Sequence, residues 1–202
     1  MEPVNRIAGR AVAVPVGNVD TDQIVPARFL YRKRREGFAD TLFHDLRADA
    51  DGRARADFAL NRPENEGAAI LVTLDNFGCG SSREHAVWAL WDAGFRSAIA
   101  ISFGDIFRNN AIENGLLPVV LAEAEVRQLM AALESGAGAE LVVDLPAQRV
   151  TLPDGRRFSF DFDPAAKENL LLGRGKIDAT LALASEIDRF ERAYRGTYPW
   201  SP

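Results

Sequence analysis

The chain has 202 residues, of which 47% are hydrophobic and 26% are charged, and its net charge is −5 at pH 7. That length suits one domain with a real core, and the acidic balance argues against general nucleic-acid binding, which needs a basic field. The N-terminus lacks the basic and then apolar layout of a secretory signal, and no apolar run approaches the length of a membrane span. We therefore expect a cytoplasmic protein that binds neither nucleic acid nor membrane.

Cys79 is the single cysteine of the sequence. One thiol cannot form an internal disulfide, and alone it cannot hold a zinc ion or an iron–sulfur cluster. We therefore expect a reduced chain without a metal site of its own.

The N-terminal third begins with a strand and continues as a long irregular segment. Apolar, β-prone residues predict a strand at 11–16, and turn-forming residues at 17–22 end it. Residues 23–30 fit either an extended segment or a short helix, because Pro26 leaves both open. Residues 31–66 are polar and rich in arginine, and we expect a long irregular loop, a feature that is usually functional or disordered.

Strands and helices alternate through the middle of the chain. In order, the pattern predicts a strand at 68–74, a loop of small residues at 76–82, a helix at 83–93, a strand at 97–101, a helix at 105–114, a strand at 116–121 and a helix at 123–134. Asp105 is the expected N-cap of the second helix, and Gly115 is expected to end it. This alternation predicts a crossover α/β core.

The C-terminal part changes character. Strands are predicted at 140–145 and 148–152, followed by a hairpin turn at Asp154-Gly155 into a further strand at 156–162, and helices are predicted at 164–172 and 178–194. We expect one compact domain over residues 1–202. Its core is expected at about 7–162 and a helical extension at about 164–195.

The loop from Asp75 to His85 (DNFGCGSSREH) carries the strongest chemical signal. It joins a strand end, a glycine turn and the expected start of a helix. Gly78 and Gly80 let backbone N–H groups approach a ligand closely, and the first amides of a helix favour anions. The loop lacks the lysine of a phosphate-binding loop and the second glycine of a nucleophile elbow. In isolation, a capping role for Ser81 or Ser82 is the simpler interpretation.

Four ordered segments, at 18–26, 29–38, 76–86 and 102–118, carry a family resemblance. The segment 76–86 (NFGCGSSREHA) resembles the signature of the swivelling domain of the aconitase superfamily. The match covers most of the chain, and it is closest to the small subunits of bacterial 3-isopropylmalate dehydratases.

The resemblance implies an α/β fold of the aconitase-like swivelling type, a single compact domain with three β/β/α layers. It implies no cofactor on this chain, because the family carries its [4Fe–4S] cluster on a separate large subunit, the implied partner. The family reaction interconverts 2-isopropylmalate and 3-isopropylmalate through 2-isopropylmaleate in leucine biosynthesis. There an iron of the cluster acts as a Lewis acid on the leaving hydroxyl.

The resemblance also assigns roles to the residues of the glycine loop. Ser81 is implied as the base that removes a carbon-bound proton next to a carboxylate. Arg83 is implied to bind a carboxylate of the small dicarboxylate substrate, for which its planar fork is suited. Ser82 is implied to bind substrate and support the loop without reacting, and Gly78 and Gly80 are implied to shape the loop behind the site.

A second set of residues is implied to complete the site. The resemblance places a further substrate arginine in the basic run at residues 32–35. Arg35 is the best match to that arginine, and Arg32 is the second candidate. Two carboxylates on a turn are too few for a calcium loop. The resemblance implies that Asp20 and Asp22 build the loop and orient site groups. His85 is implied as a supporting group or charge partner.

Other functions stay open at the level of sequence. Related hydro-lyase small subunits act on citraconate or methylmalate, on dimethylmalate or on homoaconitate, and the motifs separate these poorly. A Ser–His hydrolase would use Ser81 with His85 and would act on activated esters without a partner. A non-catalytic module that only docks on a partner would tolerate Ser81→Ala in a fully active complex.

Overall fold

The computed structural model describes residues 1–135, 140–198 and 200. Its strands are β1 (Arg6–Val14), β2 (Ile70–Thr73), β3 (Ser97–Ala100), β4 (Leu117–Val120), β5 (Glu140–Asp144), β6 (Arg149–Thr151) and β7 (Arg157–Ser159). Its α-helices are α1 (Thr21–Ile24), α2 (His44–Arg47), α3 (His85–Asp92), α4 (Asp105–Glu113), α5 (Glu123–Ser135), α6 (Pro164–Leu172), α7 (Lys176–Leu181) and α8 (Ala184–Thr197). Short 3₁₀ helices lie at Ala27–Phe29, Arg34–Glu36, Ala39–Thr41, Ala59–Asn61 and Pro63–Asn65.

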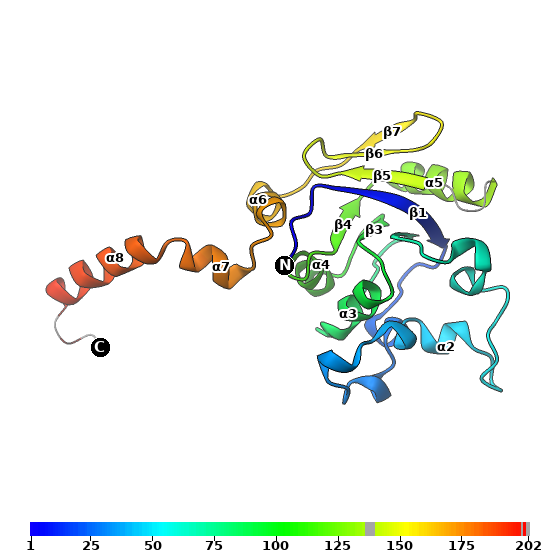
Figure 1. Cartoon of the computed structure of the whole chain (residues 1–202), viewed down its shortest axis with the longest axis horizontal. Coiled ribbons are helices and arrows are strands. Elements are labelled where there is room, and N and C mark those ends of the chain that lie inside the picture. The colour runs from blue at the N-terminus through cyan, green and yellow to red at the C-terminus, as the bar shows by residue number, and fades with distance from the viewer. Residues whose placement is uncertain (136–139, 199, 201–202) are drawn as a thin grey trace.

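The strands form a seven-stranded sheet in the order β4-β3-β2-β1-β5-β6-β7 (Figure 1). β1 to β4 run parallel, with Ala11 opposite Ile70. β5 to β7 form an antiparallel half that joins β1, with Arg6 opposite Asp144. β1 is therefore shared by both halves, and it begins earlier than the expected strand at 11–16 because its first residues pair with β5.

The parallel half of the sheet separates two hydrophobic cores. Side chains alternate along its strands, so that Leu71 and Ala98 belong to the core that includes α3 and α4. Ile70 and Ile99 belong to the opposite core, which includes α5 and the antiparallel strands. The expected three-layer α/β fold is confirmed, and its two β layers are parts of one continuous sheet.

The helices of the middle part follow the predicted apolar spacing, but the starts of α3 and α4 differ from the prediction. The helix predicted at 123–134 is α5, and its apolar face is buried, with Val126 and Leu129 fully inaccessible. The expected N-cap of α4 is wrong, because Gly104 occupies that position and Asp105 is the first helical residue. There the carboxylate of Asp105 lies in the first turn, where negative charge suits the helix dipole.

The long loop at 31–66 is irregular as expected, but it is pinned to the core by buried apolar side chains. Phe38, Leu42 and Phe43 are fully inaccessible to solvent and belong to the core next to α3. Short helical turns fill the intervals between these anchors. The loop therefore covers one side of α3 (Figure 1).

The C-terminal part forms an arm. The expected helix at 178–194 is two helices, α7 and α8, which are separated at Ala182 and Leu183. No described side chain of either helix is buried, and the two helices extend away from the sheet (Figure 1). Among the described residues, no helix has both the length and the apolar character needed to cross a bilayer. The division into a core at about 7–162 and an extension at about 164–195 stays a prediction.

Candidate active site

Three loops meet at the carboxyl end of the parallel strands. The loop after β2 contacts the loop after β1, because Gly78 N donates a hydrogen bond to Val19 O at 2.7 Å. It also contacts the loop after β3, because Phe77 N donates to Ser102 O at 3.0 Å. Ligands of open α/β sheets bind outside the carboxyl ends of the strands. This edge of the sheet is therefore where a site is expected.

Glycine is required where these loops touch. Gly78 has a φ of +73°, and a Cβ atom added to it would lie 2.2 Å from Cγ of Phe107 on α4. A Cβ atom on Gly104 would lie 2.7 Å from the carbonyl oxygen of Gly78. Gly80 has a φ of +91° but open surroundings, so it serves the turn rather than the packing.

Ser81 lies exposed at the surface of this loop, and its backbone is held by Thr21. Ser81 N donates to Thr21 Oγ1 at 3.2 Å, and the Thr21 hydroxyl donates to Ser81 O at 3.4 Å. Thr21 N also donates to Cys79 O at 2.9 Å. The sequence analysis missed Thr21, and its only signal was its position between two motif aspartates, Asp20 and Asp22.

The helix after the loop begins later than predicted. α3 starts at His85, with Glu84 at the N-cap position and no side-chain cap. A capping role for Ser81 or Ser82 is therefore wrong. Instead Arg83 N donates to Ser81 O at 2.9 Å, which closes a tight turn before the helix. Both serines are left on the surface, free of a structural hydrogen bond through their hydroxyl groups within the described residues.

Two backbone amides beside Ser81 are available to an anion. In the part of the chain that the structure describes, the N–H groups of Gly80 and Ser82 donate to no acceptor. Unpaired amides at a loop before a helix attract negative charge, as the nearby amino end of α3 does. These two amides can therefore donate to an anion that binds beside Ser81.

Arg83 is oriented by the loop after β1. Its Nη1 forms an ion pair with Oδ1 of Asp22, and both side chains are partly exposed. Asp20 caps α1, because its carboxylate accepts from Gln23 N at 2.7 Å while Gln23 Oε1 accepts from Asp20 N at 2.9 Å. The two motif aspartates thus have separate tasks, one in building the helix and one in holding the arginine.

The three arginines of the basic run at residues 32–35 lie in different environments. Arg34 forms two hydrogen bonds with Asp92 of α3, at 2.7 and 2.8 Å. Arg32 donates to Asp40 at 2.7 Å, and this pairing raises the pKa of Arg32 and lowers that of Asp40. Arg35 is exposed and makes no hydrogen bond or ion pair with the described residues. Of the two arginines predicted to bind substrate from this run, only Arg35 is uncommitted.

His85 is an aromatic packing partner in this structure. Its ring lies 5.3 Å from that of Phe38 and 4.6 Å from that of Trp88. Burial lowers the pKa of His85, with a smaller opposing effect of Glu84 and a further lowering by Arg83. No hydrogen bond joins His85 to Ser81 among the described residues, so the pair required by a Ser–His hydrolase is not formed.

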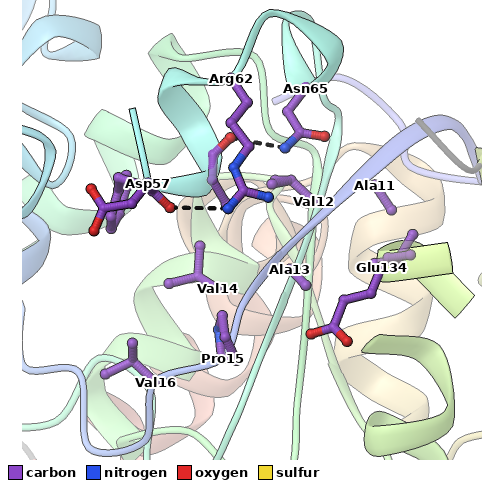
Figure 2. Close-up of a pocket in the computed structure, with 13 residues that line it drawn as sticks. Ala11, Val12, Ala13, Val14, Pro15, Val16, Asp57, Arg62, Asn65 and Glu134 are labelled. Carbon is purple, nitrogen blue, oxygen red and sulfur yellow. Dashed lines mark hydrogen bonds between the residues drawn. The ribbon is translucent and has the colours of Figure 1, made fainter. Parts of the chain in front are cut away.

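A cavity of about 230 Å³ lies elsewhere, between β1, the loop before β2 and the end of α5 (Figure 2). Its floor is formed by the apolar residues of β1, and Figure 2 shows Arg62 and Glu134 on different sides of it. Arg62 Nη2 donates to Asp57 O at 3.2 Å. Ser81 and Arg83 do not line this cavity.

The fold and the position of these loops define an aconitase-type domain. Residues 1–124 match the model of the aconitase C-terminal domain family, and residues 127–164 match a model described as LeuD_N. The crystal structure of a 3-isopropylmalate dehydratase from Methanocaldococcus jannaschii has a similar fold, with a TM-score of 0.64 and 26% identity. That comparison covers 92% of this chain and 99% of the archaeal one.

Curated relatives identify the family within this class of domains. The chain is 50% identical to the 3-isopropylmalate dehydratase small subunit of Phenylobacterium zucineum, over 99% of this chain and 98% of that protein. It is 52% identical to the small subunit of the same name from Anaeromyxobacter dehalogenans, over 96% and 100% of the two chains. The chain therefore belongs to the family of 3-isopropylmalate dehydratase small subunits.

Proposed function

We propose that this chain supplies the cluster-free half of a cytoplasmic 3-isopropylmalate dehydratase site, in which Ser81 is the base and Arg83 binds a substrate carboxylate. The reaction interconverts 2-isopropylmalate and 3-isopropylmalate through 2-isopropylmaleate. The observation that carries the proposal is the exposure of the Ser81 hydroxyl next to Arg83, at the carboxyl edge of the sheet. The exposed position of Ser81 suits a site that a second chain completes.

Ser81 has the surroundings that a serine base needs. An ordinary hydroxyl is too weak a base to remove a proton from carbon, so its oxyanion must be stabilised. The unpaired amides of Gly80 and Ser82 and the charge of Arg83 are the donors at hand. One such donor contributes about 3 kcal/mol of transition-state stabilisation in other enzymes. The proton that Ser81 takes from one carbon is available for return when water adds back in the other position.

Arg83 and Arg35 are proposed to bind the two ends of the dicarboxylate. Arg83 uses Nη1 for Asp22, which leaves further N–H donors of the guanidinium for the substrate. Arg35 has no partner among the described residues, so substrate binding there breaks no existing contact. Arg32 is the weaker candidate, because a substrate would have to displace Asp40.

The large subunit is proposed to carry the [4Fe–4S] cluster. Cys79 is the single cysteine here, and such a cluster is held by several thiolates, so the residues of this chain do not fit it. Activity is then expected only when the large subunit is present. The part of this chain in the reaction is to hold the substrate carboxylates and move the proton at the Ser81 oxygen.

The deciding experiment uses the purified complex of both subunits. Ser81→Ala is expected to lower kcat by about 1,000-fold, as loss of a general base does, while assembly and the cluster absorption are unchanged. Ser82→Ala, in the same exposed turn, is the matched control and is expected to change kcat by less than about tenfold. Full turnover by Ser81→Ala would refute the assignment. Turnover of citraconate, measured beside turnover of isopropylmalate, tests which side group the substrate carries.

A further inference from the structure

The arm formed by α7 and α8 exposes apolar side chains that nothing in the described structure covers. Ile177 is 76% exposed, Phe190 67% and Trp200 79%. The other large apolar side chains exposed along the arm are Leu181, Leu183, Ile187, Tyr194 and Tyr198. The arm extends beyond the sheet and its covering helices (Figure 1).

The exposed side chains of α8 form one stripe. Leu183, Ile187, Phe190 and Tyr194 follow each other at intervals of four, three and four residues, the spacing of one helix face. Ser185 and Arg192 lie on the opposite face at this periodicity. α8 is therefore amphipathic, and none of its residues is buried. The ring contacts on its apolar side come from the arm itself, where Tyr198 lies 4.8 Å from Tyr194.

Such an arm is matched in size to a stable interface. An isolated helix of this length is marginal in water, so its apolar stripe has to pack on something to keep α8 folded. From the exposed fractions, the apolar side chains of the arm offer on the order of 900 Å² for burial, close to the roughly 800 Å² that each partner contributes to a standard interface. The stripe of α8 supplies about half of this area, and the apolar side chains of the whole arm together reach the area of an interface.

The charges of α8 argue for a protein partner. The helix carries three acidic residues and three arginines, so its polar face is balanced. Helices that bind membrane surfaces are instead rich in lysine and arginine. A balanced polar face with an apolar stripe fits an apolar groove on a protein, where contact area and not net charge selects the partner.

The relatives indicate which protein is the partner of the arm. The matches to the two family models end at residue 164, before the arm begins. The small subunit of Phenylobacterium zucineum nevertheless matches 99% of this chain, and the match therefore includes the arm. The arm is thus shared with a chain named as a subunit, although the matched models of the domain do not reach it. A feature that lies outside the matched domain models but is shared with a chain named as a subunit is suited to subunit assembly.

We propose that the apolar stripe of α8 docks on the large subunit and anchors the two chains together away from Ser81. This inference rests on the proposed function for the existence of that partner. α6 fixes the base of the arm to the body, because Val4 N donates to Leu170 O at 2.8 Å. An anchor outside the glycine loop lets the loop meet substrate without having to supply the binding energy between the chains.

The test measures the affinity of the full-length chain for the purified large subunit. The double variant Ile187→Glu/Phe190→Glu puts two charges on the stripe and is expected to weaken binding by about 100-fold or more. Arg192→Glu changes the net charge by the same amount on the opposite face and is expected to change binding by less than about threefold. A second pair on the stripe, Leu183→Glu/Tyr194→Glu, is expected to reproduce the loss.

The outcomes separate this proposal from the assignment of Ser81. At saturating large subunit, the stripe variants are expected to regain wild-type turnover, whereas Ser81→Ala binds normally and stays inactive at every concentration. Unchanged affinity in both stripe variants would overturn the anchor. So would a wild-type chain that dimerises alone through the stripe, or that binds phosphatidylglycerol vesicles through it, with large-subunit affinity unaffected by the same substitutions.

Discussion

Gly78→Ala tests whether the glycine loop is packed on α4 as the structure shows. The φ of Gly78 is +73°, a conformation that side chains other than glycine rarely adopt. The new methyl group would lie 2.2 Å from Cγ and 2.6 Å from Cβ of Phe107, whose side chain is almost fully buried. The methyl group and the ring cannot both stay in place, so the loop or α4 must move.

The expected loss has two parts, and Gly80→Ala separates them. Gly80 has a φ of +91°, but its nearest neighbour for a Cβ atom is Asp20 Cβ at 3.6 Å, an ordinary contact. Gly80→Ala is therefore expected to cost only backbone strain, about 1–2 kcal/mol of the free energy of unfolding. Gly78→Ala adds the overpacking of a well-filled core, a further 1–3 kcal/mol or so.

Urea denaturation of the two variants and the wild type measures this difference. The midpoint is expected to fall for both variants, and to fall further for Gly78→Ala by the equivalent of at least about 1 kcal/mol. Circular dichroism of the native baselines controls for a change of fold. Equal losses in both variants would show that contact with Phe107 does not constrain the loop, and the reasoning about its packing would fail.

Three further predictions concern charged groups. Asp92→Asn removes the carboxylate that Arg34 binds, and we expect about 1 kcal/mol lower stability and faster tryptic cleavage of the long loop; wild-type cleavage rates would contradict this. Asp22→Asn leaves Arg83 without its orienting partner, so KM for the dicarboxylate should rise with kcat nearly constant, and a lower kcat alone would argue against a positioning role. Burial lowers the pKa of His85, so the unfolded chain takes up a proton first as the pH falls, and stability should decline below about pH 6.5. His85→Asn is expected to flatten that decline in thermal denaturation at several pH values, and an unaltered slope would count against it.

The core could be predicted from sequence because its signals are local. The spacing of Val126 and Leu129 predicts the buried face of α5. The strands before and after the glycine loop, β2 and β3, are short apolar runs. The glycine turn predicted at Gly78 and Gly80 is present, and both residues have positive φ angles. Each of these features depends on residues within a few positions of one another.

The parts that sequence could not provide depend on distant partners. Ser81 is held by Thr21, about 60 positions away along the chain, so no local pattern distinguished a clamped loop from a helix cap. The basic run looks uniform in sequence, yet Arg34 is committed to Asp92 while Arg35 is not. The break between α7 and α8 also has no local signal, since no proline or glycine lies at Ala182 or Leu183.

The central position of β1 has a consequence for how the chain is made. β1 is synthesised first, but it pairs with β2 through Ala11 and Ile70 and with β5 through Arg6 and Asp144. During synthesis on the ribosome, one edge of this strand must wait until most of the chain has emerged, and open strand edges invite association with other chains. Folding of the nascent chain is therefore expected to be slow at this step, and chaperones that shield extended segments are expected to bind before the chain reaches β5.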